Sequence, residues 1–288
     1  MEDDFKPALK DLRVGVIGLG LMGGSLAMAL REAQACASLS GYDVNARALD
    51  HALQRGLIDR PIDLDGDHVD VLILAAPVNA IVDWLIEIPA VFSGDFHLID
   101  LGSTKGRITA AMQALPDRIS PLGGHPMCGK ETSGLGAAAP DLYRRCLFVL
   151  TPLERTRAST LALAHQLLAA IGARPLILDP RRHDQLAAAI SHVPYLTSIA
   201  LVEAALHAHD ETVWDLAASG FRDSTRLAAS EVTMMLDIIF SNREGVLTGL
   251  SRLRTALDTL TDLIEQGDRA ALQSVMDAAR SRRITLFT

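Results

Sequence analysis

Hydrophobic and polar positions divide the chain into two parts with different periodicities. Over the first 178 residues, short apolar runs alternate with longer stretches in which apolar residues recur every three or four positions. Nearly continuous apolar runs are typical of strands covered by helices on both faces, and the longer stretches are typical of those helices. The first part of the chain therefore predicts a doubly wound α/β fold built on a parallel sheet.

The predicted helices of this part include residues 24–34 and 155–170, and Gly172 should end the second of them. The predicted strands cover residues 14–17, 38–42, 69–75, 96–101, 118–120, 147–150 and 174–178.

From residue 180 onward the sequence predicts helices and hardly any strand. Pro194 should interrupt the first of these helices. The segment Ser241-Asn242-Arg243-Glu244 has the form of a capping box, which predicts a long helix through Leu263, and a further helix is predicted after Asp268. These helices carry more apolar residues than one thin layer can bury. We therefore predict an α/β domain over residues 1–179 and an all-α domain over residues 180–288 that pairs with a second copy as a homodimer.

Composition narrows the choice of partners. Hydrophobic residues make up 49% and charged residues 22% of the chain, and we find neither a secretory signal nor a membrane-spanning segment. A formal net charge of −8 with no basic run longer than two residues disfavours nucleic-acid binding. The three cysteines are widely spaced and form neither a disulfide framework nor a zinc site. We expect a cytoplasmic protein with a small-molecule partner, and no metal, membrane or nucleic acid.

A glycine-rich segment directly follows the first predicted strand. Gly18-Leu19-Gly20-Leu21-Met22-Gly23 lies between an apolar run and a predicted helix, as in the fingerprint of Rossmann-type dinucleotide-binding folds. Gly18 would allow the tight turn, Gly20 the approach of backbone N–H groups to a pyrophosphate, and Gly23 close packing of helix on strand. The helix N-terminus adds unpaired donors and partial positive charge. A glycine turn without a ligand is the alternative, which the strand and helix on either side disfavour.

Asp43 ends the second predicted strand, twenty positions after Gly23. In this fold such an acid accepts hydrogen bonds from the ribose of the adenosine, and its charge repels the 2′-phosphate of NADP. Arg47 lies close by and would partly offset that repulsion. We therefore predict NAD as the cofactor. Its predicted binding residues are Gly18, Gly20, Leu21, Met22, Gly23, Asp43, Arg47, Ala76, Pro77 and Ser103.

Two further glycine-containing segments follow predicted strands, so they should lie at the carboxyl edge of the sheet, where ligands bind in such folds. They are Asp100-Leu101-Gly102-Ser103-Thr104-Lys105 and Gly123-Gly124-His125-Pro126-Met127-Cys128-Gly129-Lys130-Glu131. We expect His125 to lie in an uncrowded loop and to accept a proton from an alcohol as hydride leaves the same carbon. A structural histidine that holds the loop is the alternative. The presence of Ser103 and His125 on two loops at the cofactor edge favours the catalytic interpretation.

The chain resembles the prephenate/arogenate (cyclohexadienyl) dehydrogenase family of tyrosine biosynthesis. The resemblance is carried by the fingerprint, the two segments above, Ser191-His192-Val193-Pro194 and Gly220-Phe221-Arg222-Asp223-Ser224-Thr225-Arg226. It implies a Rossmann domain followed by a helical dimerisation domain. It also implies NAD-dependent oxidative decarboxylation of a cyclohexadienol, either prephenate to 4-hydroxyphenylpyruvate or arogenate to tyrosine.

The same resemblance implies roles for individual residues. His125 matches the catalytic histidine, which hydrogen-bonds the ring hydroxyl, and Ser103 matches the serine that orients it beside the nicotinamide. Arg226 matches the arginine that holds the ring carboxylate, and Glu131 matches an acid at the rim of the site. Arg222 stands where the family often has lysine, and it either reaches the site or belongs to an ion-pair network.

One position departs from the family pattern. Tyr195 stands near the substrate side chain, where the family commonly has a second histidine, so the choice between prephenate and arogenate stays open. His192 is either a site residue or a buried, hydrogen-bonded helix histidine. His183 and Asp184 are interpreted as a helix start. Because the helical segment runs to the end of the sequence, we expect no fused regulatory or mutase domain.

Two other classes of protein remain as alternatives. β-Hydroxyacid dehydrogenases also join a Rossmann domain to a helical one, but they rely on a lysine in the second domain, and residues 180–288 contain none. A non-enzymatic NAD-binding protein would have no reason to keep His125, Ser103 and Arg226 together.

Overall fold

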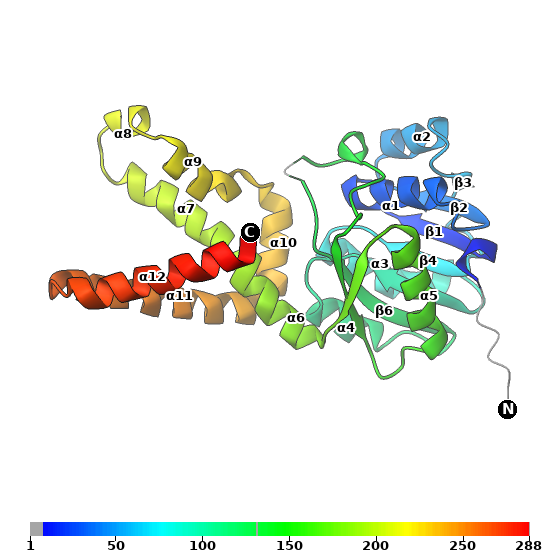
Figure 1. Cartoon of the computed structure of the whole chain (residues 1–288). Helices are drawn as coiled ribbons and strands as arrows, with labels where there is room; N and C mark the ends of the chain where they lie inside the picture. Colours follow the sequence, from blue (N-terminus) through cyan, green and yellow to red (C-terminus); the bar gives the residue numbers. More distant parts are fainter. Residues whose placement is uncertain (1–7, 131, 288) are drawn as a thin grey trace.

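The computed structural model describes residues 8–130 and 132–287 and forms a sheet domain and a domain of helices alone (Figure 1). The sheet domain lies on the right in Figure 1 and the helical domain on the left, with α10 (Val232–Ser241) standing between them. The chain leaves the sheet at Asp179, whose carboxylate accepts hydrogen bonds from two backbone N–H groups at the start of α6 (Pro180–Ala187).

Among the described residues, the sheet has eight strands in the order β3-β2-β1-β4-β5-β6-β7-β8. The predicted parallel arrangement is confirmed from β1 to β6, whereas β7 turns back as an antiparallel partner of β6 and β8 follows β7. The short β3 was not predicted. The strands are β1 (Arg13–Ile17), β2 (Ser38–Tyr42), β3 (Arg60–Pro61), β4 (Val71–Leu74), β5 (Phe96–Asp100), β6 (Ile119–Pro126), β7 (Leu147–Pro152) and β8 (Arg174–Ile177).

Helices cover both faces of the sheet, as expected from its apolar strands. One face carries α1 (Leu21–Glu32), α2 (Ala46–Gln54) and α5 (Ala158–Ala170), whose buried leucines and alanines join one hydrophobic core. The other face carries α3 (Val78–Val91) and α4 (Gly106–Met112), which bury their apolar side chains in a second core. Gly172, with a φ of 71°, follows α5 as predicted.

Strand β6 is longer than the predicted 118–120, and it carries His125 as a strand residue rather than a loop residue. Its glycines explain the difference. A Cβ on Gly124 would lie 2.5 Å from the carbonyl oxygen of Asp100, so only a residue without a side chain lets β6 continue beside the end of β5. The antiparallel pairing of His125 with Val149 of β7 then fixes the backbone of the histidine.

The helical domain consists of α6, α7 (Val193–Leu206), α8 (Thr212–Asp215), α9 (Ser219–Thr225), α10, α11 (Arg243–Glu265) and α12 (Arg269–Phe287). A π-helical turn, Ala188–His192, separates α6 from α7 directly before Pro194, where an interruption was predicted. The wider turn accommodates a residue that has no N–H to donate. Helices α11 and α12 confirm the two helices predicted at the end of the chain and form a hairpin that points away from the sheet (Figure 1).

The predicted capping box at the start of α11 is wrong. Asn242, not Ser241, is the N-cap, and its side chain does not cap the helix. The Asn242 amide instead donates to the carbonyl oxygen of Asp184 (2.7 Å), and the Ser241 hydroxyl lies 2.8 Å from the hydroxyl of Thr104. A contact within the helical domain, from Asn242 to Asp184, and one to the sheet domain, from Ser241 to Thr104, have replaced the local hydrogen bonds of the box.

The run Pro180–Leu206 is long and apolar enough, by length and composition, to cross a membrane, with a mean hydropathy of 1.3. It also buries four polar side chains, His183, Asp184, His192 and Ser198, and it packs against α11. Core helices of globular proteins pass the same test. The hydrogen bonds of Asp184 to α4 and to Asn242 show that part of this run packs against the rest of the protein.

Candidate active site

The glycine loop lies in the crevice where the strand order reverses, between the carboxyl ends of β1 and β4. Ligands bind at such a point in doubly wound sheets. Gly18 has a φ of 93°, and a Cβ there would lie 2.3 Å from the carbonyl oxygen of Ala75. The tight turn assigned to Gly18 therefore requires glycine.

Gly20 and Gly23 have contrasting surroundings. A Cβ on Gly23 would lie 1.8 Å from the carbonyl oxygen of Gly18, which shows how closely α1 approaches the strand. A Cβ on Gly20 would meet no atom of the described residues within 4 Å. Gly20 is the N-cap of α1, and no side chain of the described part caps that end. Open space beside an uncapped helix N-terminus fits the pyrophosphate of a dinucleotide.

Asp43 joins the glycine loop to the end of β2. Its Oδ2 accepts a hydrogen bond from the Leu19 N–H (2.7 Å), and its Oδ1 accepts one from the Asn45 N–H (2.8 Å). Each carboxylate oxygen can accept a second hydrogen bond, so the ribose hydroxyls assigned to Asp43 still find acceptors. The other predicted cofactor residues lie in the first turn of α2 (Arg47), at the start of α1 (Leu21, Met22) and just after β4 (Ala76, Pro77).

His125 is half-buried near the end of β6 and contacts a second histidine. Its Nδ1 lies 2.8 Å from Nε2 of His183 on α6, and the two rings meet edge to face with centroids 5.0 Å apart. Nδ1 of His183 lies 2.8 Å from Oδ1 of Asp184. The three side chains form a continuous hydrogen-bonded chain from a carboxylate to His125.

Asp184 is buried where three elements meet. Its carboxylate accepts hydrogen bonds from the N–H groups of Lys105 (2.7 Å) and Gly106 (2.8 Å) at the start of α4. Its backbone carbonyl accepts from the side chain of Asn242 at the start of α11. Asp184 thus holds the helical domain against the sheet domain while it contacts His183.

Asp100 and Lys105 form a buried ion pair next to the same site. Both side chains are 0% exposed, and the Lys105 ammonium donates to the Asp100 carboxylate and to the carbonyl oxygen of Gly124 (2.5 Å). The carboxylate also accepts from the N–H groups of Gly102 (2.8 Å) and Gly124 (3.1 Å). Removing one partner of a buried pair typically costs about 3–5 kcal/mol. The pair therefore fixes the ends of β5 and β6 and puts a cation beside His125.

The surroundings of His125 favour its neutral form. Burial lowers the pKa of His125 well below the ordinary value for histidine, and the neighbouring His183, Lys105 and His192 lower it further. A neutral imidazole can accept a proton, so His125 is available as a base near neutral pH.

The residues implied by the family resemblance are spread over several elements. Ser103 is half-buried in the turn after β5, and among the described residues the hydrogen-bond partner of His125 is His183 rather than Ser103. Arg226 is exposed and begins a 3₁₀ turn, Arg226–Ala229. Arg222 is exposed on α9 and lies 3.5 Å from Asp223. Glu131 lies outside the described residues.

His192 and Tyr195 are both buried in the helical domain. Nδ1 of His192 lies 3.3 Å from the side-chain amide of Asn242, so His192 is a buried, hydrogen-bonded helix histidine, and a role in the site stays a prediction. Burial lowers the pKa of His192 to about 4. The ring of Tyr195 packs with Met235 and Ile238 in the small core of this domain.

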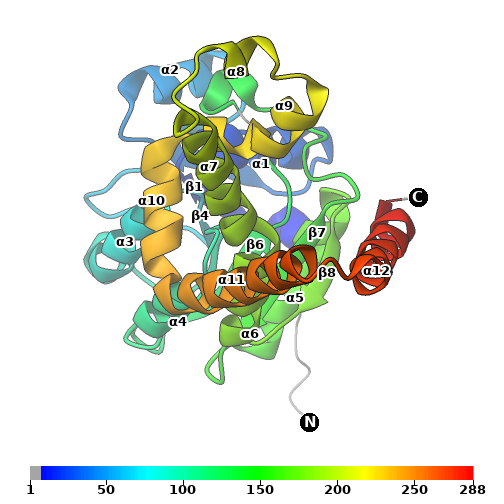
Figure 2. The same cartoon turned by 90° about the vertical axis from the view of Figure 1, so that its left-hand side faces the viewer.

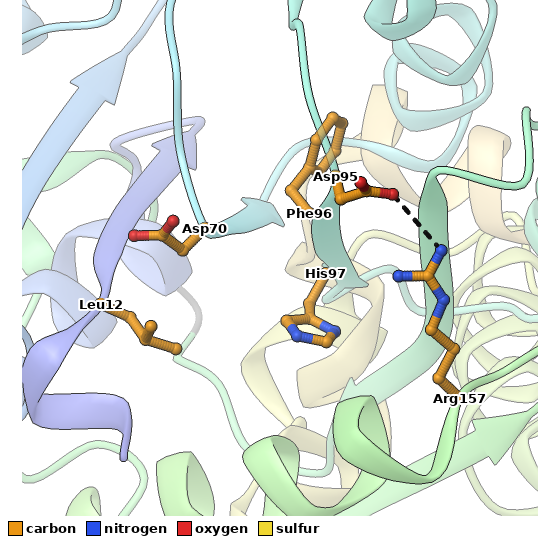
Figure 3. Close-up of a pocket in the computed structure, with 6 residues that line it drawn as sticks. All are labelled: Leu12, Asp70, Asp95, Phe96, His97 and Arg157. Atoms are coloured by element: carbon orange, nitrogen blue, oxygen red, sulfur yellow. Dashed lines mark ion pairs between the residues drawn. The ribbon is translucent and has the colours of Figure 1, made fainter. Parts of the chain in front are cut away.

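The cavity drawn in Figure 3 lies at the opposite edge of the sheet from the glycine loop. It has a volume of about 170 Å³. Apart from Arg157 at the start of α5, its lining residues stand before or at the amino ends of the strands, away from the edge where this fold binds ligands. His97 is hydrogen-bonded to Thr160 (2.7 Å), and Arg157 faces Asp95 at 3.6 Å. Within the described residues, no group of three or more His, Cys, Asp or Glu side chains could hold a metal ion.

Several residues of the site had no assigned role in the sequence. His183 and Asp184 were interpreted only as a helix start, and Asp100 and Lys105 were quoted in a motif without a function. The sequence did contain a signal for Asp100 and Lys105. An acid and a lysine at the carboxyl end of a buried strand lie away from solvent, so they are expected to pair with each other. No local signal connects His183 with His125, since 58 residues separate them.

Two family models of known proteins match this chain. The family model of the prephenate dehydrogenase nucleotide-binding domain matches residues 26–177, and that of the prephenate dehydrogenase dimerization domain matches residues 179–278. A prephenate dehydrogenase of Bacillus subtilis (strain 168) is 32% identical over 92% of this chain and 74% of its own length.

Solved structures show the same likeness. A prephenate dehydrogenase from A. aeolicus in complex with hydroxyphenyl propionate and NAD+ superposes with a TM-score of 0.88 at 27% identity, over 95% of this chain and 98% of its own. An arogenate dehydrogenase from Synechocystis superposes with a TM-score of 0.83 at 29% identity, over 95% of this chain and 99% of its own. Because both family models together span nearly the whole chain, the protein belongs to the prephenate dehydrogenase family.

Proposed function

We propose that this protein oxidises and decarboxylates prephenate, arogenate or both, with His125 as the base. The observation that carries the proposal is a histidine held neutral at the same sheet edge as the glycine loop. NAD binds at that loop, and when bound it supplies the hydride acceptor.

The proposed reaction balances without a net proton. The C–H bond of the hydroxyl-bearing ring carbon breaks, and its electron pair leaves as hydride. The bond between the ring and its carboxylate breaks, and its electron pair enters the ring as CO₂ departs. His125 takes the hydroxyl proton as the C–O bond gains double-bond character and returns it to the oxygen of the phenol. Aromatisation drives the reaction, so the protein mainly positions the ring and supplies one base.

The remaining predicted residues are proposed to bind the substrate. Arg226 is assigned to the ring carboxylate, because the planar guanidinium suits a carboxylate. Ser103 is assigned to the boundary between nicotinamide and substrate. Glu131 and Arg222 are assigned to the rim of the site. His192 and Tyr195 are proposed to shape the wall near the substrate side chain from within the helical domain.

The choice of substrate, the assembly and the location are part of the same proposal. The relatives above carry the names of both prephenate and arogenate dehydrogenases, so the proposal covers both substrates. The name of the matching second family model, a dimerization domain, supports a homodimer through residues 180–288. The net charge of −8 and the biosynthetic relatives support a cytoplasmic enzyme.

The test is NADH absorbance after prephenate or arogenate is added to the protein with NAD. We expect turnover with at least one substrate, and we expect His125→Asn to lower kcat by about 10²-fold or more while NAD binding is retained, as for loss of a general base. No rise in NADH absorbance with either substrate would contradict the proposed reaction. Near-normal turnover of His125→Asn would show that His125 is not the base. A preference for NADP would contradict the role given to Asp43.

A further inference from the structure

With a neutral His183, the chain from Asp184 through His183 to His125 has one consistent arrangement of protons. A carboxylate only accepts hydrogen bonds, so the 2.8 Å contact between Asp184 and Nδ1 of His183 requires a proton on that nitrogen. Nε2 of a neutral His183 is then unprotonated and can only accept a hydrogen bond. The 2.8 Å contact between the two rings therefore requires His125 to donate from its Nδ1.

A neutral imidazole carries one ring proton, so this arrangement leaves Nε2 of His125 with a free lone pair. We propose that His183 and Asp184 are positioning residues that hold His125 in the tautomer able to accept a proton through Nε2. Asp184 acts through His183, as the aspartate of a Ser-His-Asp triad acts through its histidine. The inference rests on the proposed function, in which His125 is the base.

Charges around His125 give Asp184 a second effect. The groups that face His125 are His183 and Asp184 from α6, His192 from the π turn, and Lys105, paired with Asp100, from the start of α4. Lys105 opposes the positive charge that His125 gains when it takes a proton.

The Asp184 carboxylate stabilises that charge, because each imidazole of the chain donates toward it. Two backbone N–H groups of α4 hold the carboxylate in place, so it needs no rearrangement during the reaction.

The substitution Asp184→Asn tests the chain from its far end. An amide has one acceptor oxygen where the carboxylate has two, so it cannot accept from His183, Lys105 and Gly106 together, and it has no charge to stabilise a protonated His125. We expect kcat to fall about 10²-fold or more, while KM and the Kd for NAD change less than about threefold. Unchanged kcat in a folded Asp184→Asn protein would overturn the proposal.

Two variants of His183 separate positioning from packing, and neither removes a hydrogen bond to α4. His183→Phe keeps a ring of similar size but breaks both links, and we expect kcat to fall about as far as in Asp184→Asn. His183→Gln has an oxygen that can accept from His125 and an amide that can donate to Asp184, so we expect kcat within about tenfold of the native value. Equal kcat in the two variants at equal thermal stability would overturn the proposal.

A direct measurement on the native protein needs no variant and no turnover. ¹⁵N NMR of histidine-labelled protein distinguishes protonated from bare ring nitrogens, and we expect His125 to be protonated at Nδ1 and bare at Nε2, with the signal assigned by its loss in His125→Asn. A proton on Nε2 would overturn the proposal even if the enzyme is active. Absence of turnover together with the expected tautomer would contradict the proposed function and leave the positioning chain intact.

Discussion

At the scale of single residues, His192 links protonation to stability. It is buried in the π turn, and burial lowers its pKa to about 4, although the Asp184 carboxylate partly opposes that shift. An unfolded chain binds this proton at about pH 6.5. The folded protein therefore binds fewer protons between these values. Neutral His192 therefore contributes about 3 kcal/mol to the free energy of unfolding. This contribution is complete above about pH 6.5 and is lost as the pH falls toward 4.

We expect His192→Asn to flatten this dependence. The asparagine oxygen can accept from the Asn242 amide, as Nδ1 of His192 does, but the side chain does not titrate. Urea unfolding at pH 4.5 and pH 7 measures the free energy of unfolding for both proteins. The native protein should lose about 2–3 kcal/mol more than the variant between these values. Equal losses in the two proteins would show that His192 is not the group that titrates.

The site residues that the sequence could predict are those with a local signature. Gly18 directly follows β1 and His125 lies near the end of β6, and both belong to glycine-containing motifs, so topology alone brings them to one edge. His183 has no such signature, because its role depends on where α6 packs beside α4, after more than fifty residues of intervening chain. Long-range contacts of this kind determine which polar side chains are buried together. The spacing of apolar residues along the sequence does not reveal these contacts.

At the scale of elements, the glycine loop allows a matched comparison. Gly20→Ala adds a methyl group in open space at a φ of −74°, so we expect native stability but a Kd for NAD raised about tenfold or more. Gly18→Ala adds one at a φ of 93° against a carbonyl oxygen, so we expect a loss of about 2 kcal/mol or more in unfolding free energy. Calorimetry of NAD binding and thermal melts separate the two effects. Native NAD affinity in Gly20→Ala would place the pyrophosphate elsewhere.

Helices and strands with a regular hydrophobic pattern were predicted well. The strands β1, β2 and β5 and the helices α11 and α12 agree with their predicted positions to within a few residues. Strand β6 extends beyond the predicted 118–120 through Gly123 and Gly124, residues that disfavour a strand interior. In the structure they extend the strand, since the close approach of Asp100 and β7 leaves no space for side chains. Tertiary packing has overridden the local preference.

At the scale of the whole molecule, the helical domain exposes large hydrophobic side chains along its long helices. Large hydrophobic side chains are exposed on α10, α11 and α12, and the described side chains of α12 include no buried one. Figures 1 and 2 show α11 and α12 projecting from the sheet domain with little cover. A helix gains most of its stability from packing of an apolar face, so α12 needs a partner surface.

The partner we expect is a second copy of this chain, and sedimentation equilibrium should give about twice the chain mass of 30.9 kDa. Met276 and Ile284 lie two turns apart on α12 and are 61% and 46% exposed. Replacing both with glutamate would bury charge in the interface, so we expect monomers and a lower Tm. Ile86→Glu is the control, because Ile86 is 75% exposed on α3 in the sheet domain. It should stay dimeric. A monomeric native protein, or a dimeric Met276→Glu/Ile284→Glu protein, would place the covering surface elsewhere.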